Sequence, residues 1–217
     1  MSIAEHLFTI TEKLPQGVRL VAVSKFHPVE RIREAYDAGH RLFAESRPQE
    51  FAAKVPQLPS DIEWHFIGHL QTNKLKLVLP YVALVQSVDS LHLLEAIDAW
   101  GREHGRVISV LLELHLGAEE TKQGFSAEEI RSLLGSRFDH VTIRGLMGMA
   151  TNTEDEAVIE ADFRRIETLF RALQAEFPAL TDFTELSIGM SGDWPVAVRH
   201  GATMIRIGTD IFGPREY

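Results

Sequence analysis

Short apolar runs alternate with longer stretches in which apolar residues recur every three or four positions, from residue 18 to residue 207. The short runs are typical of buried parallel strands, and the longer stretches are typical of helices that cover a sheet. We expect strands at 18–24, 42–44, 64–67, 82–85, 107–114, 141–146, 185–188 and 204–207. We expect the intervening helices at 28–36, from about 48, and at 70–79, 90–104, 126–134, 156–177 and 194–200.

An additional helix is expected before the first strand, because Ile3, Leu7 and Ile10 fall on one helical face and Ser2 can cap its start. Eight strands that alternate with helices, without a linker rich in Pro, Gly or Ser, predict one α/β domain over residues 1–217. The expected fold is therefore a single (β/α)8 TIM barrel with an extra N-terminal helix. A doubly wound open sheet is the alternative, since both folds share this alternation.

The composition narrows the class of protein. A net charge of −9 argues against a broad nucleic-acid surface, and the absence of cysteine excludes disulfides and thiolate metal sites. Glu5, Glu12 and Lys13 interrupt the apolar residues at the start, so this segment is not a signal peptide. No apolar run approaches the ~20 residues that a membrane helix needs. We expect a soluble, cytoplasmic protein that binds neither nucleic acid nor membrane.

Lys25 follows the first apolar run directly and is the leading candidate for chemistry. Ligands of α/β folds bind at the carboxyl ends of the strands, where this lysine is expected. Burial at such a place makes an amine a better nucleophile for an aldehyde. The alternative is a lysine that extends from the strand end into solvent.

Glycines and hydroxyl residues follow the last two expected strands. In barrels, the loops after the seventh and eighth strands often bind phosphate through backbone N–H groups, and glycine allows the close approach that this requires. The alternative is that these residues only cap the following helices. The glycines are Gly189, Gly192 and Gly208, and the hydroxyl residues are Ser187, Ser191 and Thr209.

Arg206 lies within the last strand. Side chains alternate along a strand, so Ile205 and Ile207 share one face and Arg206 takes the other. If the isoleucines pack against the helices, Arg206 points into the barrel, where a charge needs a partner. That partner is either a carboxylate, such as Glu113 or Glu45, or a polar atom of a ligand.

A lysine, a phosphate-binding loop and an inward arginine together describe a site for pyridoxal 5'-phosphate (PLP). The lysine forms an imine with the aldehyde of PLP, the loops hold the phosphate, and a side chain addresses the pyridine nitrogen. An arginine in that last position keeps the nitrogen unprotonated, which makes the ring a weak electron sink.

The chain resembles the YggS/PROSC family of pyridoxal phosphate homeostasis proteins, whose fold is similar to the barrel domain of alanine racemase. The resemblance extends from residue 22 to residue 215, and the order and spacing of its motifs make it specific. The matching stretches are Ala22-Val23-Ser24-Lys25, Trp64-His65-Phe66-Ile67-Gly68 with Leu70-Gln71 and Asn73-Lys74, Ser87-Val88-Asp89, Gly145-Leu146-Met147, Gly189-Met190-Ser191 with Asp193, and Ile205-Arg206-Ile207-Gly208-Thr209 leading to Ile211-Phe212-Gly213.

This resemblance implies that Lys25 carries PLP as an imine and that Arg206 faces the ring nitrogen. It implies that residues 187–191, including Met190, hold the phosphate together with Gly208 and Thr209. Lys122 and Gly124 match a further family pattern, in which Lys122 is either a second amine near the site or an exposed loop residue.

Three positions depart from the family pattern. Ser46 replaces an asparagine expected near Lys25, His115 stands in place of another asparagine, and Asp210 adds a negative charge beside the phosphate loops. Ser46 is kept among the residues expected around the cofactor. His65 is included as well, in a supporting role, because the strand–loop context of His65 and His69 does not bring both onto one metal.

Two functions remain open from the sequence. The first is a carrier or regulator that holds PLP, limits its free aldehyde and supplies apo-enzymes that depend on PLP. The second is a PLP-dependent amino-acid racemase, which needs an acid or base on each face of the imine. Because the chain ends soon after the eighth strand, we expect no second domain to supply that base. We therefore expect a carrier, active as a monomer.

Overall fold

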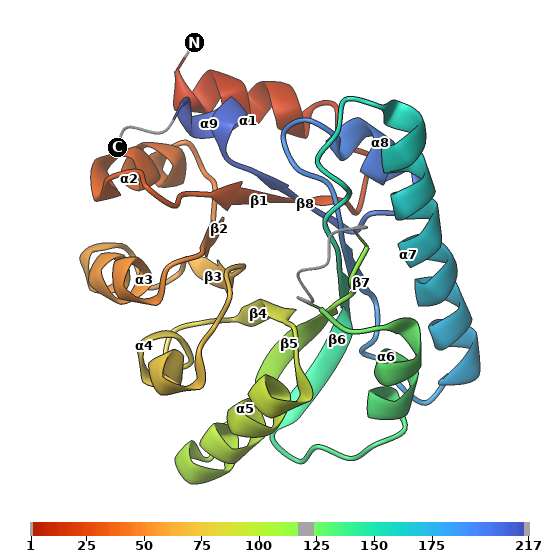
Figure 1. Cartoon of the computed structure of the whole chain (residues 1–217). Coiled ribbons are helices and arrows are strands. Elements are labelled where there is room, and N and C mark those ends of the chain that lie inside the picture. The colour runs from red at the N-terminus through yellow and green to blue at the C-terminus, as the bar shows by residue number, and fades with distance from the viewer. Residues whose placement is uncertain (1, 117–123, 215–217) are drawn as a thin grey trace.

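The computed structural model describes residues 2–116 and 124–214 of the protein. Eight parallel strands form a closed barrel in chain order, with helices around it (Figure 1). The TIM barrel is confirmed, and the open-sheet alternative is wrong because β1 pairs with β8. The strands are β1 (Arg19–Val23), β2 (Leu42–Glu45), β3 (Glu63–Phe66), β4 (Leu84–Val88), β5 (Ile108–Glu113), β6 (Val141–Met147), β7 (Glu185–Ser187) and β8 (Met204–Ile207).

The helices follow the strands as expected in most places. They are α1 (Ile3–Thr11), α2 (Val29–Asp37), α3 (Pro48–Lys54), α4 (Leu75–Val78), α5 (Leu91–His104), α6 (Ala127–Leu134), α7 (Glu156–Glu176), α8 (Trp194–Arg199) and α9 (Thr209–Phe212). Two short 3₁₀ helices lie at Val55–Gln57 and Thr72–Lys74. The second of these starts the segment expected as one helix over 70–79, so α4 is only a single turn.

Alternation along the strands separates two apolar clusters. The barrel interior contains Val21, Val23, Ala44, Leu111 and Met204 in a small cluster. The neighbouring strand residues point outward against the helices and belong to the main core. The interior is thus narrow and packed, and polar residues along it stand out.

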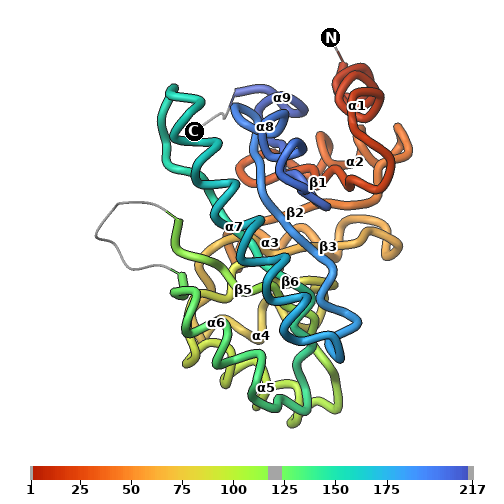
Figure 2. The backbone as a smooth tube through the Cα atoms, turned by 90° about the vertical axis from the view of Figure 1, so that its right-hand side faces the viewer, coloured from red at the N-terminus to blue at the C-terminus, as the bar shows by residue number. Residues whose placement is uncertain are grey.

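The expected N-terminal helix is confirmed as α1, whose Ser2 and Glu5 form a capping box. α1 lies beside α9, and His6 Nδ1 is 3.1 Å from the carbonyl oxygen of Ile211, so the two ends of the described chain meet (Figures 1 and 2). The helix before β1 thus packs against the helix that follows β8, and these two strands pair to close the barrel.

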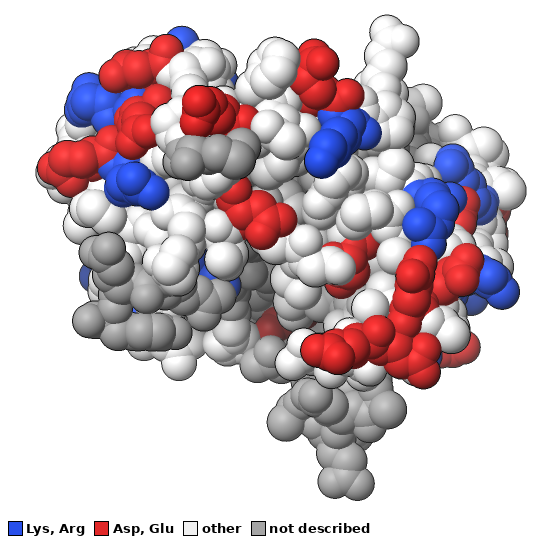
Figure 3. All heavy atoms as spheres, turned by 90° about the horizontal axis from the view of Figure 1, so that it is seen from above, with Lys and Arg blue, Asp and Glu red and all other residues white. Residues whose placement is uncertain are grey.

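The surface carries both signs of charge. On the face drawn in Figure 3, acidic and basic side chains lie next to one another in groups at both sides. In the part of the chain that the structure describes, no helix is long and apolar enough to span a membrane.

Candidate functional site

Lys25 lies at the carboxyl end of β1 and is half-buried. Val21 and Val23 point into the barrel, and Lys25 follows two residues after Val23, in the turn by which the chain leaves β1. Next to it, Phe26 has a φ of +68°, and it is the one residue other than glycine with a positive φ in residues 2–116 and 124–214. The chain therefore turns sharply at the lysine itself.

Arg206 points into the barrel, as expected, because Ile205 and Ile207 pack in the outer core. Arg206 as a whole residue is 4% exposed. Nη1 donates to the carbonyl oxygen and to Oγ of Ser187, both at 2.7 Å, and Nη2 donates to the carbonyl oxygen of Gly148 at 2.9 Å. Burial lowers the pKa of Arg206 to about 10, so it stays charged at neutral pH.

The expected carboxylate partners of Arg206 are elsewhere. Glu45 faces the outer side of β2 and pairs with Lys54, and Glu113 makes no ion pair with the arginine within 4.0 Å among the described residues. Burial raises the pKa of Glu113, and the arginine acts on it only through its longer-range charge. Arg206 is thus a buried cation whose hydrogen bonds go to neutral oxygens, while Glu113 and Asp193 act on its charge only from a longer distance. A buried cation without a direct ion pair is costly.

The loops after β7 and β8 lie at the same end of the barrel as Lys25, because all eight strands are parallel. Gly208 lies against β1, since a Cβ there would be 3.2 Å from the carbonyl oxygen of Val23. Gly189 has a φ of +94°, and a Cβ there would be 2.6 Å from the Cβ of Ala197. Thr209 opens α9, so its N–H has no acceptor within that helix. Gly208 thus packs closely against β1 and Gly189 against α8, and the backbone of Gly189, Ser191, Gly208 and Thr209 is the candidate phosphate cradle at this end of the barrel.

Two residues expected in this cradle have other partners. The Ser187 hydroxyl is fully buried and lies between Arg206 and Gln86, to whose Oε1 it donates at 2.6 Å. The Met190 N–H donates to a carboxylate oxygen of Asp193. Ser191 is half-buried and Thr209 is exposed, so their hydroxyls are the more accessible donors.

His65 lies deeper in the barrel than expected for a residue near a ligand. Its Nε2 is 3.0 Å from Oε1 of Glu63, and its Nδ1 is 2.7 Å from Nε2 of Gln86. Burial lowers the pKa of His65, so the ring is neutral, accepts from Gln86 and donates to Glu63. His65 reaches Arg206 only through Gln86 and Ser187, and its placement supports a structural role.

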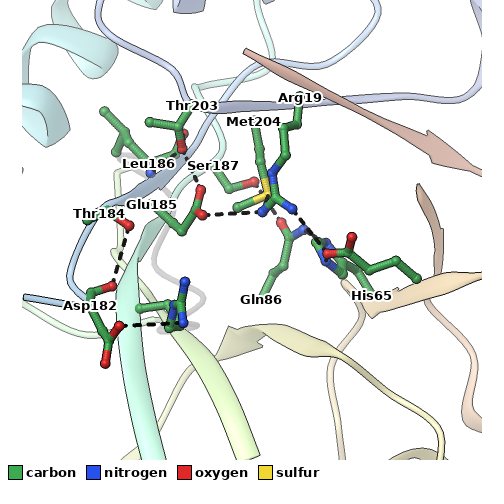
Figure 4. A network of polar contacts seen from close by, with 12 residues as sticks. Arg19, His65, Gln86, Asp182, Thr184, Glu185, Leu186, Ser187, Thr203 and Met204 are labelled. Atoms are coloured by element: carbon green, nitrogen blue, oxygen red, sulfur yellow. Dashed lines mark hydrogen bonds and ion pairs between the residues drawn. The ribbon is translucent and has the colours of Figure 1, made fainter. Parts of the chain in front are cut away.

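Below His65, the amino end of the barrel holds a small cavity of about 190 Å³. Arg19 spans it, with ion pairs to Glu63 at 3.1 Å and Glu185 at 3.3 Å. Figure 4 shows Arg19 between Glu185 and His65, with Gln86 and Ser187 continuing the network into the barrel. The charges at this end are compensated by one another.

Sequence reasoning missed Gln86. It lies on β4, is fully buried, and links the network of His65 to Ser187. The sequence contained a signal, because a glutamine that follows the apolar run 82–85 directly must find hydrogen-bond partners if the strand continues and buries it.

The structure also shows where the three residues that depart from the family pattern lie. Ser46 is half-buried, and its backbone packs against Gly68, where a Cβ would be 2.0 Å from the Ser46 carbonyl oxygen. His115 is half-buried beside a cavity of about 840 Å³, and Asp210 is exposed on α9. Lys122 lies outside the described residues.

Comparisons with known proteins identify the family and the fold of this chain. Residues 2–216 match the family model of the alanine racemase N-terminal domain. The pyridoxal phosphate homeostasis protein of Vibrio alginolyticus is 38% identical over 212 residues, covering 94% of this chain and 90% of the relative. Its counterpart in Synechocystis sp. is 39% identical over 210 residues, covering 95% of each.

Solved structures support the same family and fold. PipY of Synechococcus elongatus, with PLP bound, matches with a TM-score of 0.90 and 41% identity over 98% of this chain and 100% of PipY. Alanine racemase from Corynebacterium glutamicum has a TM-score of 0.75 at 14% identity, covering 99% of this chain and 61% of the racemase, and therefore shows the fold alone. The chain belongs to the family of pyridoxal phosphate homeostasis proteins, built on the barrel of the alanine racemase N-terminal domain.

Proposed function

We propose that this protein binds PLP through an imine at Lys25 and acts in PLP homeostasis as a carrier. The observation that carries the proposal is Arg206, a buried cation with neutral acceptors alone among the described residues, in the same barrel as Lys25. Such a charge is most simply explained by a ligand atom that completes its coordination. The relatives named above and the PLP-bound PipY structure support this choice of ligand.

The residues present fit PLP. The amine of Lys25 adds to the aldehyde and water leaves, which forms the imine. The backbone cradle of Gly189, Ser191, Gly208 and Thr209 takes the phosphate, and Arg206 donates to the pyridine nitrogen. In solution, PLP supplies an electrophilic aldehyde, and this protein sequesters it.

The comparisons favour a carrier over a racemase, because the relatives at 38% and 39% identity are pyridoxal phosphate homeostasis proteins, whereas alanine racemase is 14% identical and similar in fold alone. Arg206 does not decide between the two functions, since a guanidinium on the pyridine nitrogen is compatible with both. We propose delivery to apo-enzymes that depend on PLP, in the cytoplasm and from a monomer, as the working form of this function.

The test is an absorbance titration of the purified protein with PLP, next to Lys25→Ala and to Lys76→Ala, an exposed lysine on α4. We expect a saturable imine band in the wild type and in Lys76→Ala, and none in Lys25→Ala. A band that Lys25→Ala retains would overturn the site. Amino-acid racemisation by the loaded wild type above that of free PLP would overturn the carrier in favour of the racemase.

A further inference from the structure

A compact ion cluster lies behind Lys25, on the outer side of the barrel. Lys54 of α3 is 6% exposed, and its Nζ is 2.7 Å from Oε1 of Glu45 and 2.6 Å from Oε1 of Glu50. Glu45 is fully buried and also accepts a hydrogen bond from Oγ of Ser24 at 2.7 Å. Two carboxylates thus share one ammonium in a buried place.

This cluster holds the two peptide groups that flank Lys25. Lys54 Nζ donates to the carbonyl oxygen of Ser24 at 2.9 Å, and this carbonyl belongs to the peptide bond that precedes Lys25. The N–H of Phe26 donates to Oε1 of Glu50 at 2.7 Å, and this N–H belongs to the peptide bond that follows Lys25. The backbone is therefore fixed immediately before and immediately after the lysine.

The second of these contacts supports an unfavourable conformation. A φ of +68° is strained for phenylalanine and persists only where the surroundings determine it. The hydrogen bond from its N–H to Glu50 is such a determinant. The guanidinium of Arg47, 4.2 Å from the centre of the Phe26 ring, is a second determinant. We expect that losing the hydrogen bond to Glu50 weakens the restraint on residues 25 and 26 and makes the direction of the Lys25 side chain less defined.

An ion cluster is an expensive way to pack this position. Burial raises the pKa of Glu45 to about 7, and its Oε2 has no hydrogen-bond partner among the described residues. Apolar residues of similar size would pack a helix against β2 with a smaller desolvation cost. The cluster is thus better explained as a group that orients the backbone around Lys25 than as a contribution to the stability of the fold.

We propose that Glu50 and Lys54 are positioning residues for Lys25, which hold its flanking peptide groups so that its amine points into the barrel. This inference rests on the proposed function, since it assigns the cluster to the imine. Neither residue is expected to touch PLP.

The test compares Glu50→Ala with Glu50→Gln, because glutamine retains an acceptor for the Phe26 N–H and alanine removes it. The matched control is Asp98→Ala on α5. Asp98 likewise accepts from a backbone N–H, that of His140 at 2.8 Å, and pairs with a cation four residues on, Arg102 at 2.9 Å. The wild type and each variant are titrated with PLP, and the absorbance of the imine is measured.

We expect Glu50→Ala to raise the Kd for PLP about tenfold, with less imine at saturation, whereas Glu50→Gln and Asp98→Ala stay within about threefold of wild type. In the cofactor-free protein, we expect faster hydrogen exchange at the Phe26 amide in Glu50→Ala but not in Asp98→Ala. Lys54→Met should reproduce the binding defect.

Two results would overturn the inference. One is wild-type PLP binding and wild-type exchange at Phe26 in Glu50→Ala. The other is an equal loss of binding in Asp98→Ala, which would reflect general destabilisation. If the wild type forms no imine at all, the proposed function fails, while the exchange measurement still reports whether Glu50 holds the turn.

Discussion

At the amino end of the barrel, Arg19 pairs with Glu63 and Glu185, and each charge has a partner of opposite sign. In the half of the barrel nearer the carboxyl end, Arg206 is more deeply buried than Arg19 but donates only to neutral oxygens of Ser187 and Gly148. Both arginines are on strands of the same barrel, so the fold alone does not explain the difference. We interpret direct ion pairs as a sign of a structural role, and a buried cation without a direct ion pair as a sign of a binding site.

Among the substitutions that test this comparison, Arg206→Met should have the largest effect on PLP binding. Removing the guanidinium takes away a charge-assisted donor to PLP and should weaken binding by more than about tenfold. The free energy of unfolding of the cofactor-free protein should change by less than about 1 kcal/mol, because a buried charge without a direct ion pair is also removed. PLP titration and urea denaturation measure the two quantities, and unchanged PLP affinity would contradict our reading of Arg206.

A second prediction concerns pH, where Glu45, behind Lys25, and Glu63, at the amino end, should act with opposite signs. The hydrogen bond from His65 lowers the pKa of Glu63 from 4.5 to about 2, so its contribution to stability is present above pH 4.5 and is lost as the pH falls towards 2. Burial raises the pKa of Glu45 from 4.5 to about 7, so stability decreases as the pH rises from 4.5 through 7.

Urea denaturation at stepped pH separates these two effects. Glu63→Gln should flatten the stability curve below pH 4.5, and Glu45→Gln should flatten it between pH 4.5 and 7. The Glu63 effect should be the smaller, because its side chain is 44% exposed and solvent screens it. A Glu45→Gln protein with the wild-type slope between pH 4.5 and 7 would contradict the assignment.

Arg19→Met should show the opposite pattern to Arg206→Met, with lower stability and unchanged PLP affinity. We expect a loss of about 1 kcal/mol in the free energy of unfolding, since two part-exposed carboxylates lose their common partner. Affinity for PLP should stay at the wild-type value, because the network of Arg19 is at the other end of the barrel. Weaker PLP binding together with intact stability would show that the amino end belongs to the binding site.

The smallest effect is expected from Asp210→Asn. Asp210 lies in the first turn of α9, beside the proposed phosphate cradle, but it is exposed and screened by solvent. Removing its charge should tighten PLP binding by at most about threefold, and less at high salt. A larger gain would mean that Asp210 points at the phosphate.

The barrel could be predicted from the sequence because the period of its apolar residues changes at almost every element boundary. β8 was predicted at its observed bounds, and the inward direction of Arg206 followed from Ile205 and Ile207 alone. β4 was placed too early, since Gln86 and Ser87 make its second half look polar although both are buried. Such burial depends on partners from distant strands, which local sequence does not reveal.

For the candidate site, the sequence indicates the types of residue involved but not their contacts. Lys25, Gly189 and Gly208 can be selected from the sequence because each of them directly follows an expected strand. That Ser187 supports Arg206, and that Glu50 holds the turn at Phe26, depends on side-chain directions at the ends of three different elements. No spacing rule gives those directions.

The most direct test of the account is to locate the imine. The wild type is loaded with PLP, reduced with borohydride, digested, and mapped by mass spectrometry for the peptide that carries the pyridoxyl group. The account predicts one stoichiometric modification, at Lys25. A label spread over surface lysines, or placed on another lysine in the wild type, would contradict it.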